Sequence, residues 1–381
     1  MQKVYNHPRP ITNRSLVLKN TKIYNMRSIL RVPLLLCCLF LLASTSQGQD
    51  MHFTNYAMTP SFFNPALAGN FSGTVRAGLA FRTQHEFIPS SVAATPFRTI
   101  GISVDAPLIF GFKKTHWLGV GLSILQDQVG ISNPNTGTNP GIGDGLSQSW
   151  GRFVPGVSYN IGLDKKFRQV VSIGVQYGLT NVNYTGTDFE QELDILGQPN
   201  PDRDRFNSLD GISANYGSIN VGVTYKSLIS KTAEMELGAA VMHLQNPTFS
   251  LPMGQNATVY RRINIHGRYR VQSSKQLALE PSLFASFQGA QNNIQAQMRS
   301  EYKLKPKSDI ALIAGLGYRL SDAVQLLTGA RYKDWLISLS YDYALTAASD
   351  ISPHKIELGA SRIFTVNKRP KVDPTLYCPR M

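Results

Sequence analysis

The sequence predicts an all-β protein, namely a transmembrane antiparallel β-barrel of about 14 strands whose lumen is either open or plugged. Three observations predict this fold: an export signal near the start, apolar residues that alternate with polar ones in segments of about ten residues, and the lack of a long apolar run after residue 48. Composition alone decides little, because 381 residues with 42% hydrophobic and 16% charged residues also suit one or two ordinary domains.

Residues 26–48 have the pattern of a signal peptide. Arg27 and Arg31 precede an apolar run at 32–43, and the small-residue stretch 44–48 follows. The run is too short for an ordinary membrane-spanning helix, so we expect cleavage between Gly48 and Gln49; an uncleaved anchor is the alternative. Residues 1–25 hold five basic and no acidic residues, an unusual preface to a signal peptide, and we interpret them as a mis-assigned upstream start.

Removal of residues 1–48 changes the charge and the cysteine content of the chain. These residues hold seven Lys and Arg and no Asp or Glu, so the formal charge falls from +14 to +7. Cys37 and Cys38 leave with them, and the leucines at 34–36 lack the small residue that a lipoprotein signal places before its cysteine. Only Cys378 remains, so no internal disulfide is expected and the fold depends on burial and backbone hydrogen bonds.

The chain after residue 48 is predicted to be a series of strands. At 118–124 the apolar residues alternate with Gly119, Gly121 and Ser123, and 171–179 alternates in the same way. A period of two is that of a strand with one apolar face. The same pattern predicts strands at 219–225, 277–287, 294–302, 310–318, 335–343 and 356–364, with weaker examples near 75, 97, 152, 235, 262 and 324.

Periodicity does not separate a soluble sandwich from a membrane barrel, but three further features favour the barrel. Small and polar residues fill the second face, connections alternate between long and short, and aromatic residues stand at strand ends. The aromatic residues are Trp117, Trp150, Tyr177, Tyr225, Tyr269, Tyr302, Tyr318, Trp335 and Tyr343. We therefore assign residues 75–364 to an outer-membrane barrel, 49–74 to a segment that leads into it or plugs it, and 365–381 to a basic periplasmic tail.

The strand register predicts the face of individual residues. Val120 and Val175 should face lipid, whereas Ser123 and Gln176 should face the lumen, so arginine is expected to be tolerated at position 123 and costly at position 120. The long connections fall near 83–96, 128–149, 181–212, 244–258 and 344–354, and with both chain ends in the periplasm they would face outward.

Charges differ between the two sets of connections. The loop 181–212 holds seven acidic residues, and the tight turns hold lysines. The lysines are Lys113, Lys114, Lys165, Lys166, Lys226, Lys231, Lys275, Lys303, Lys305, Lys307 and Lys333. A plain alternative is that Lys and Asp are common turn residues. Further charges fall on the lumen face and are expected either to filter solutes or to pair with one another in a plugged lumen: Arg76, Arg82, Asp105, Glu280, Arg299, Glu301 and Asp342.

No catalytic motif is found in the chain. A nucleophile elbow, a zinc-protease motif, a Cys-x-x-Cys pair and a phosphate-binding loop are all missing. Asp202 and Asp204 alternate as calcium ligands do, but Phe206 and Asn207 break the spacing. Basic residues lack interleaved aromatics, so nucleic acid is not an expected partner. We predict no enzymatic activity, no cofactor and no metal site.

Several short motifs extend over nearly the whole mature chain. Residues 49–60 read QDMHFTNYAMTP, and 63–69 read FNPALAG, which contains Asn64, Pro65 and Gly69. Later motifs include FRTQ at 81–84, with Arg82 and Gln84, and SYDY at 340–343, with Tyr341 and Asp342. Together these motifs resemble the PorP/SprF family of type IX secretion and gliding-motility proteins. His85 departs from the Trp usual in the family, and Lys355 with Ile356 separates His354 from Glu357.

The resemblance implies an outer-membrane protein that works with the periplasmic ring and motor of the type IX machinery and with a large secreted adhesin. In that setting the tail is a candidate docking segment through Lys368, Arg369, Lys371 and Cys378, although a loose chain end is the alternative. Asn64-Pro65 is either part of a plug or a turn before the first strand. The rival functions are a general or substrate-specific porin and an outer-membrane lipase-like enzyme.

Overall fold

The computed structural model describes residues 53–84, 97–108, 115–130, 146–186, 212–250, 256–345 and 354–365. Residues 1–25, the signal peptide at 26–48 and its cleavage site at Gly48 and Gln49 lie outside the described residues. The tail from residue 366, which includes Lys368, Arg369, Lys371 and Cys378, also lies outside them. The acidic loop around residues 188–210 does so as well, and the contrast in charge between the two sets of connections therefore stays a prediction.

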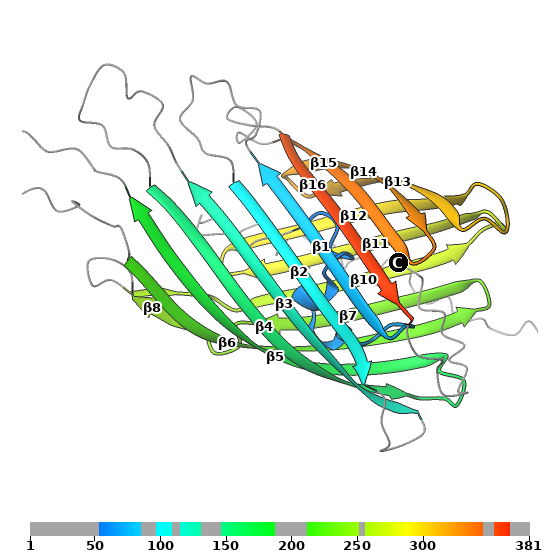
Figure 1. The fold of residues 1–381 in the computed structure, drawn as a ribbon, viewed down its shortest axis with the longest axis horizontal. Helices are drawn as coiled ribbons and strands as arrows, with labels where there is room; N and C mark the ends of the chain where they lie inside the picture. The colour runs from blue at the N-terminus through cyan, green and yellow to red at the C-terminus, as the bar shows by residue number, and fades with distance from the viewer. Residues whose placement is uncertain are drawn as a thin grey trace, which may run out of the picture. The chain divides into compact units, whose positions relative to one another are not determined.

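The described chain is a closed antiparallel barrel of 14 strands (Figure 1). In chain order the first seven barrel strands are β1 (Val75–Gln84), β2 (Phe97–Leu108), β3 (His116–Gly130), β4 (Leu146–Gly162), β5 (Gln169–Gly186), β6 (Ile212–Ser230) and β7 (Ala233–Met242). The other seven are β10 (Arg262–Gln272), β11 (Leu277–Gln288), β12 (Gln291–Lys303), β13 (Ile310–Arg319), β14 (Ala323–Tyr332), β15 (Trp335–Ala344) and β16 (His354–Phe364). The predicted fold class and all fourteen predicted strands are confirmed.

The barrel closes where β1 pairs with β16. The register runs from Val75 opposite Phe364 to Gln84 opposite Lys355. Closure leaves no free edge along the length that the described barrel strands share, so their backbones find hydrogen-bond partners without water, as a lipid environment requires. The loop-end part of β6 extends beyond this length, because its pairing with β7 begins only at Val221. Among the described residues, no helix is long and apolar enough to cross a membrane.

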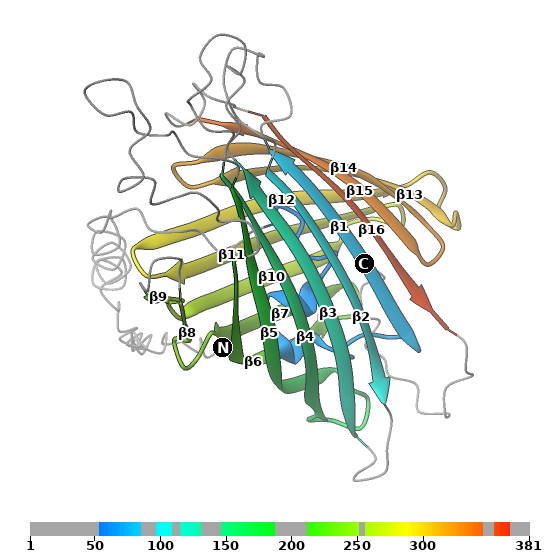
Figure 2. The ribbon, with the colours of Figure 1, turned by 60° about the vertical axis from the view of Figure 1, so that its left-hand side comes forward.

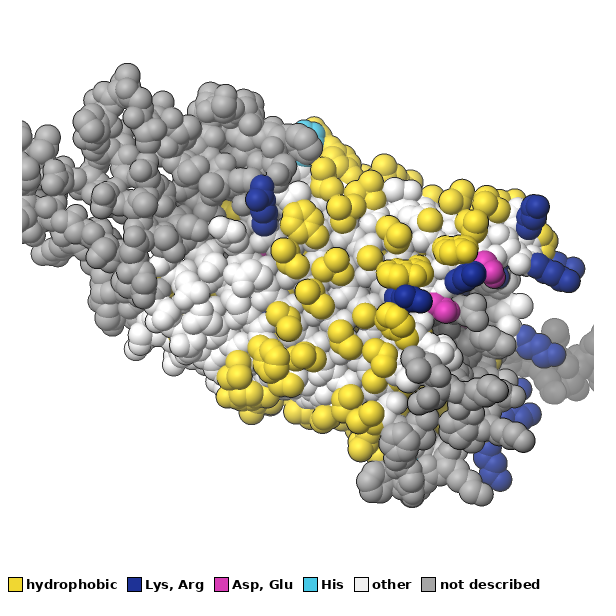
Figure 3. Space-filling model, viewed as in Figure 1, with side chains coloured by type: hydrophobic (Ala, Val, Ile, Leu, Met, Phe, Trp, Pro, Cys, Tyr) yellow, Lys and Arg dark blue, Asp and Glu magenta, His cyan; other side chains and the backbone are white. Residues whose placement is uncertain are grey.

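The two-residue alternation separates the wall into an apolar outside and a polar inside. On β5, Val175 is 46% exposed, whereas Gln176 is 2% exposed and faces inward. Val120 is half-buried on the outer face of β3, and Ser123 is fully buried on its inner face. The predicted register is therefore confirmed. Figure 3 shows hydrophobic side chains spread over the outer surface of the wall.

Strands β4, β5 and β6 are longer than predicted, and at the loop end they extend beyond β7 (Figure 1). They include parts of the expected loops 128–149 and 181–212. Two short strands, β8 (Thr248–Ser250) and β9 (Asn256–Thr258), pair within the expected loop 244–258. Phe249 of this hairpin packs on Tyr216 of β6 with ring centroids 5.4 Å apart. The extension is thus lined on its inner side by an apolar cluster.

Two tryptophans that were assigned to an outer aromatic girdle point inward instead. Trp150 packs against Phe249 with ring centroids 5.8 Å apart, and Trp117 donates a hydrogen bond from Nε1 to the Gly69 carbonyl at 3.0 Å. Both residues stand at strand ends, but on the inward phase of their strands. The assignment of these two residues to the girdle was wrong because it used position along the strand and ignored the alternation.

The two ends of the barrel differ, and we name them by their connections. The turn end carries the short turns 163–168, 231–232, 273–276, 304–309 and 333–334, together with the start of β1 and the end of β16. The loop end is the opposite one, where β1 ends at Gln84 and β16 begins at His354.

Candidate functional site

Residues 53–74, which we call the internal segment, lie inside the barrel (Figures 1 and 2). The segment contains two short 3-10 helices, η1 (Pro60–Phe62) and η2 (Pro65–Leu67), and its residues from Phe53 to Asn70 are all buried. Near the turn end, Lys226 Nζ donates to the Asn70 carbonyl at 2.7 Å. At the other extreme, Thr54 lies among residues of the loop end. The segment therefore crosses the lumen from one end of the barrel to the other.

The internal segment is bonded around nearly the full circumference of the wall. It exchanges hydrogen bonds with twelve of the fourteen barrel strands, namely β1–β7, β10, β12, β13, β15 and β16. Its rings also pack on the wall, because Tyr56 and Phe63 each lie 5.3 Å from the ring of Phe284 on β11. Polar bonds and apolar contacts together fix its position.

Asn64, a residue of the predicted family motif, connects the segment to two strands. Its Oδ1 accepts a hydrogen bond from the Ala66 N–H at 2.9 Å and so caps η2, where Pro65 supplies the fixed φ of a first helical position. Its Nδ2 lies 3.1 Å from the Val223 carbonyl of β6 and 3.2 Å from the Ala239 carbonyl of β7. The motif thus shapes a turn and also bonds that turn to the wall.

Inward-facing glycines give the segment room to approach the wall. A Cβ at Gly174 of β5 would overlap the peptide between Pro65 and Ala66, and a Cβ at Gly222 of β6 would overlap the Asn64 amide. Only glycine leaves the wall backbone open to such contact. These lumen-facing glycines therefore allow the internal segment to contact the wall backbone. In the sequence they are visible only as small residues.

A buried ion pair holds the turn end of the segment. Arg76 donates to Asp105 from Nε at 2.9 Å and from Nη2 at 2.7 Å, and it also donates to the Leu67 carbonyl at 3.0 Å. Asp105 in turn accepts the Gly69 N–H at 2.7 Å. Gly69 has φ of 61°, a left-handed conformation that favours glycine, in agreement with the predicted reversal.

A larger cluster holds Thr54 at the loop end. The Thr54 hydroxyl donates to Asp342 at 2.7 Å and accepts from Arg82 at 2.9 Å and Arg319 at 3.1 Å, while its backbone N–H donates to Glu357 at 2.7 Å. Arg82 lies 3.4 Å from Asp342 and 3.3 Å from Glu357. With Gln297 of β12, which donates to the Thr54 carbonyl at 2.9 Å, five strands converge on one residue of the internal segment.

The cluster continues to the turn between β13 and β14. Asp322 accepts from Arg319 at 2.9 Å and lies 3.2 Å from Lys355. Burial raises the pKa of the Asp322 carboxyl, but Lys355 and Arg319 lower it by more, so its pKa lies below the ordinary value of 3.8. With this turn included, the cluster has three basic and three acidic side chains. The predicted pairing of lumen charges is confirmed for Arg82 and Asp342, as it is for Arg76 and Asp105.

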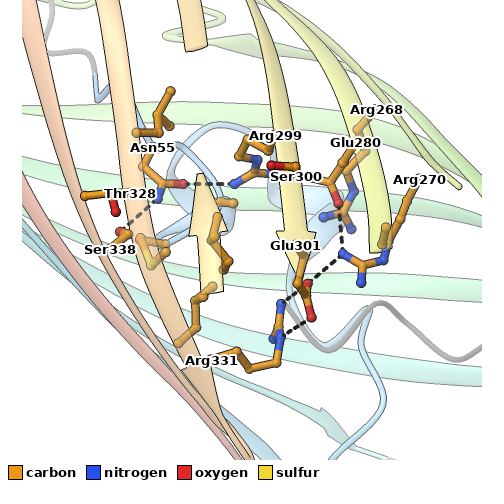
Figure 4. A pocket seen from close by; sticks show the side chains of 16 residues that line it. Asn55, Arg268, Arg270, Glu280, Arg299, Ser300, Glu301, Thr328, Arg331 and Ser338 are labelled. Carbon is orange, nitrogen blue, oxygen red and sulfur yellow. Dashed lines mark hydrogen bonds and ion pairs between the residues drawn. The ribbon is translucent and has the colours of Figure 1, made fainter. Parts of the chain in front are cut away.

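Asn55 joins this cluster to a second ionic network on neighbouring strands of the same part of the wall. Its N–H donates to Glu357 at 2.8 Å, its Nδ2 donates to Ser338 at 2.9 Å, and its Oδ1 accepts from Arg299 at 3.4 Å. Figure 4 shows Asn55 between Ser338 and Arg299. Asn55 thus contacts both ionic networks.

The second network lies toward the turn end, on β10, β11, β12 and β14 (Figure 4). Arg331 binds Glu301 through two hydrogen bonds of 3.0 and 3.1 Å, Arg270 binds Glu301 at 3.0 Å, and Arg299 pairs with Glu280. These side chains border a cavity of about 40 Å³, with room for about three water molecules. The network is therefore suited to holding the wall and the segment together rather than to binding a large solute.

The turn end has a basic rim, which we define as the charged residues of the five short turns and their flanks. Its cations are Lys165, Lys166, Arg168, Lys231, Lys275, Lys303, Lys305, Lys307 and Lys333. Its acids are Asp164, Asp309 and Asp334, so the described rim has a formal excess of six positive charges. Lys and Arg side chains stand beyond the hydrophobic surface at this end in Figure 3. Lys226 was expected here, but it faces inward and pairs with Glu236 at 3.0 Å.

The predicted motif residues fall into two groups. Asn64, Pro65, Gly69, Arg82 and Asp342 come together through the internal segment. Gln84 and Tyr341 do not, because Gln84 pairs in register with Lys355 and Phe97, and the Tyr341 hydroxyl bonds His354 Nδ1 at 2.6 Å.

Sequence reasoning missed several functional side chains, including Thr54 as the anchor and Arg319, Arg331 and Glu357 as partners in the networks. The period-two alternation places each of the three charged residues on the inner face of its strand, so it could have predicted that they face the lumen.

The comparisons with known proteins agree with this geometry. The model of the family described as type IX secretion system membrane protein PorP/SprF matches residues 45–141 and 143–359. The chain belongs to the PorP/SprF family. It is thus an outer-membrane barrel of the type IX secretion system family. No curated protein matches the sequence.

Solved structures share the barrel of this PorP/SprF protein. The toluene transporter TbuX of Ralstonia pickettii is 13% identical, with a TM-score of 0.51 over 84% of this chain and 96% of that protein. A Pseudomonas aeruginosa FadL homologue is 10% identical, with a TM-score of 0.46 over 81% and 94%. At these identities the likeness concerns the fold alone.

Proposed function

We propose that this PorP/SprF barrel is a plugged, non-enzymatic component of the type IX secretion system that supports the secretion or surface attachment of a partner adhesin. The observation that carries the proposal is the internal segment, which is bonded to twelve strands and anchored at both ends of the lumen. A lumen occupied in this way suits a protein that acts through its surfaces. It suits an open diffusion pore less well.

In this proposal the turn end faces the periplasm, and its basic rim contacts acidic surfaces of the periplasmic ring and motor. An excess of positive charge on one face steers and orients a partner of opposite charge. The tail follows Phe364 at the same end. The described chain begins at Phe53, whose neighbour Thr54 is bound at the loop end. This position argues against the expectation that both chain ends face the periplasm.

Adhesin display tests the secretion role directly. Cells that carry only Lys305→Glu with Lys307→Glu should assemble the barrel, lose most of the displayed adhesin and lose salt-sensitive co-purification of ring proteins. Lys305→Arg with Lys307→Arg keeps the charge and is the matched control. Normal display in the glutamate variant would contradict ring contact through this rim.

A porin is the second candidate function, because the fold neighbours include a protein described as a toluene transporter. Conductance in planar lipid bilayers separates the two functions. The plugged barrel should conduct little, and a stable open channel of porin size in the unmodified protein would favour the porin.

A further inference from the structure

A polar furrow runs along the outside of the barrel near the loop end, across β1 to β6. Three successive rows of outward-facing residues define it, and within each row the residues are directly paired across the strands. The lowest row is Leu79, Ile102, Ile124, Phe153, Leu179 and Gly217. The middle row is Phe81, Ile100, Gln126, Gly151, Asn181 and Asn215. The upper row is Thr83, Arg98, Gln128, Ser149, Asn183 and Ser213.

These rows mark the place where the outer surface changes from apolar to polar. Outward residues on one strand are two positions apart, so successive rows are separated by about 7 Å along the strand. On β5 the outward residues are apolar as far as Leu179 and then become Asn181 and Asn183. The middle row therefore lies at the edge of the hydrocarbon layer, at the level of lipid headgroups.

The surface is hollowed along the middle row. A depression of about 640 Å³ lies over β3 to β6, and one of about 380 Å³ lies over β1 to β3; Gln126 borders both. Gly151 leaves the larger hollow open, because it has no side chain to fill it and only the end of the Gln126 side chain lies near. The Tyr177 side chain covers Gly217 at its border. The Asn181 amide donates to Asn215 Oδ1 at 2.8 Å, which fixes two amides on its floor.

The chemistry of the furrow suits a saccharide. Amides both donate and accept hydrogen bonds, as sugar hydroxyls do, and the middle and upper rows supply Gln, Asn and Ser with Arg98 as their one cation. On β1 and β2 the middle row is apolar, with Phe81 and Ile100, and Thr83 of the upper row is buried. The lower row offers Phe153 and Leu179 to an acyl chain. The basic rim at the opposite end is rich in lysine and suits phosphate headgroups instead. The two ends of the barrel thus match two different headgroup layers.

We propose that this furrow binds a saccharide-bearing lipid of the outer leaflet, with its sugar against the middle and upper rows and its acyl chains against the lower row. The proposal rests on the orientation given above, in which the loop end faces outward. It does not depend on the adhesin or on the secretion ring.

The test is retention of glycolipid by the purified barrel. Gly151→Leu fills the hollow, and a Cβ there meets only the flexible end of Gln126, so the wall is expected to fold. Asn181→Leu with Asn215→Leu removes two amides without filling it. Asn292→Leu is the matched control, because Asn292 is an exposed amide at the loop end of β12. Heat-modifiability on gels checks that every variant forms a barrel.

Mass spectrometry of lipids extracted after purification in mild detergent gives the readout. Both furrow variants should retain about tenfold less glycolipid than the unmodified protein and the Asn292 control. The double asparagine variant loses hydrogen bonds to the sugar, and Gly151→Leu blocks the hollow that the sugar would occupy. Added lipid A should raise the unfolding temperature of the unmodified protein and of the control only. Equal retention by all variants would overturn the proposal.

Two further outcomes are decisive against it. If the furrow variants lose a co-purifying protein while lipid retention is unchanged, the furrow is a protein contact. If phospholipid vesicles without lipid A stabilise the unmodified protein as well as vesicles that contain it, the furrow has no preference for a saccharide. This test does not measure adhesin display. Its result would therefore stay valid even if the proposed secretion role were wrong.

Discussion

The hydroxyl of Thr54, on the internal segment, donates a hydrogen bond of 2.7 Å to the carboxylate of Asp342, on β15. Asp342 also lies 3.0 Å from Arg319 and 3.4 Å from Arg82, and all three charged side chains are nearly fully buried. Because removal of one partner leaves the others as uncompensated buried charges, Asp342→Asn should destabilise the barrel by about 3 kcal/mol. Urea unfolding in phospholipid vesicles measures the loss. Asp334→Asn, in the exposed turn 333–334, should cost less than about 0.5 kcal/mol, and equal costs for the two variants would contradict the assigned role.

Gly174 and Gly178 face inward on the same strand, but only Gly174 touches the internal segment. Gly174→Ala should displace the turn at Pro65 and Ala66, cost about 1 to 3 kcal/mol through overpacking, and raise the conductance of the barrel in planar bilayers. Gly178→Ala meets first the Ser218 hydroxyl, at 2.8 Å, and no atom of the internal segment, so any strain should stay within the wall. A conductance increase in Gly178→Ala alone would show that the segment does not close the lumen.

Substitutions at Val120 and Ser123 test which face of β3 each residue occupies, with the prediction for Ser123 revised by the structure. Val120→Arg places a charge on the lipid face and should cost about 2 to 4 kcal/mol near the middle of the bilayer. The expected tolerance of Ser123→Arg is not supported, because the Ser123 hydroxyl lies 2.9 Å from that of Ser61 and the position is fully enclosed. Ser123→Ala is the appropriate lumen control. Assembly yield in heat-modifiability gels should be low for both arginine variants and normal for the alanine.

Asp322 should make the loop-end cluster sensitive to acid. Because the folded-state pKa lies below the ordinary value of 3.8, the carboxylate stabilises the fold above that value, and the stabilisation is lost as the pH falls through the folded pKa. The unmodified protein should therefore be more stable than Asp322→Asn at pH 7, and the gap should narrow at about pH 3. Unfolding temperatures at the two pH values measure the gap. Asp309→Asn, at an exposed turn, should show no gap, and a gap for Asp322→Asn that does not change with pH would refute the assignment.

Deletion of residues 366–381 tests the predicted docking tail. The barrel strands end at Phe364, so the truncated barrel should fold, while adhesin secretion and salt-sensitive co-purification of ring proteins should be lost. Labelling of Cys378 should require a permeabilised outer membrane. Normal adhesin display by the truncated barrel would refute docking, and labelling in intact cells would overturn the assigned orientation.

The alternation of apolar and polar residues was enough to predict the strands and the face of residues such as Val175 and Gln176. It did not predict that Thr54 would meet Asp342, because that contact joins residues 288 positions apart and depends on the closed barrel. The lumen glycines were also ambiguous, since a small residue facing water and a small residue facing a buried peptide look alike in sequence. Trp117 and Trp150 were assigned wrongly for a different reason. They were placed in the girdle because they are aromatic, although the alternation along their strands puts them on the inner face.

The anchoring of Thr54 also determines the order of events in assembly. The Thr54 N–H is bound by Glu357, 303 residues later in the chain and on the last strand. The first residues of the described chain therefore reach their final partners only after β16 is in place, and contacts of such long sequence separation form late and slowly. Until then the carboxylates and guanidinium groups of the wall that bind Thr54 lack this partner. They must be solvated by water or protected by a chaperone. The internal segment would thus take its final position only once the barrel wall has closed.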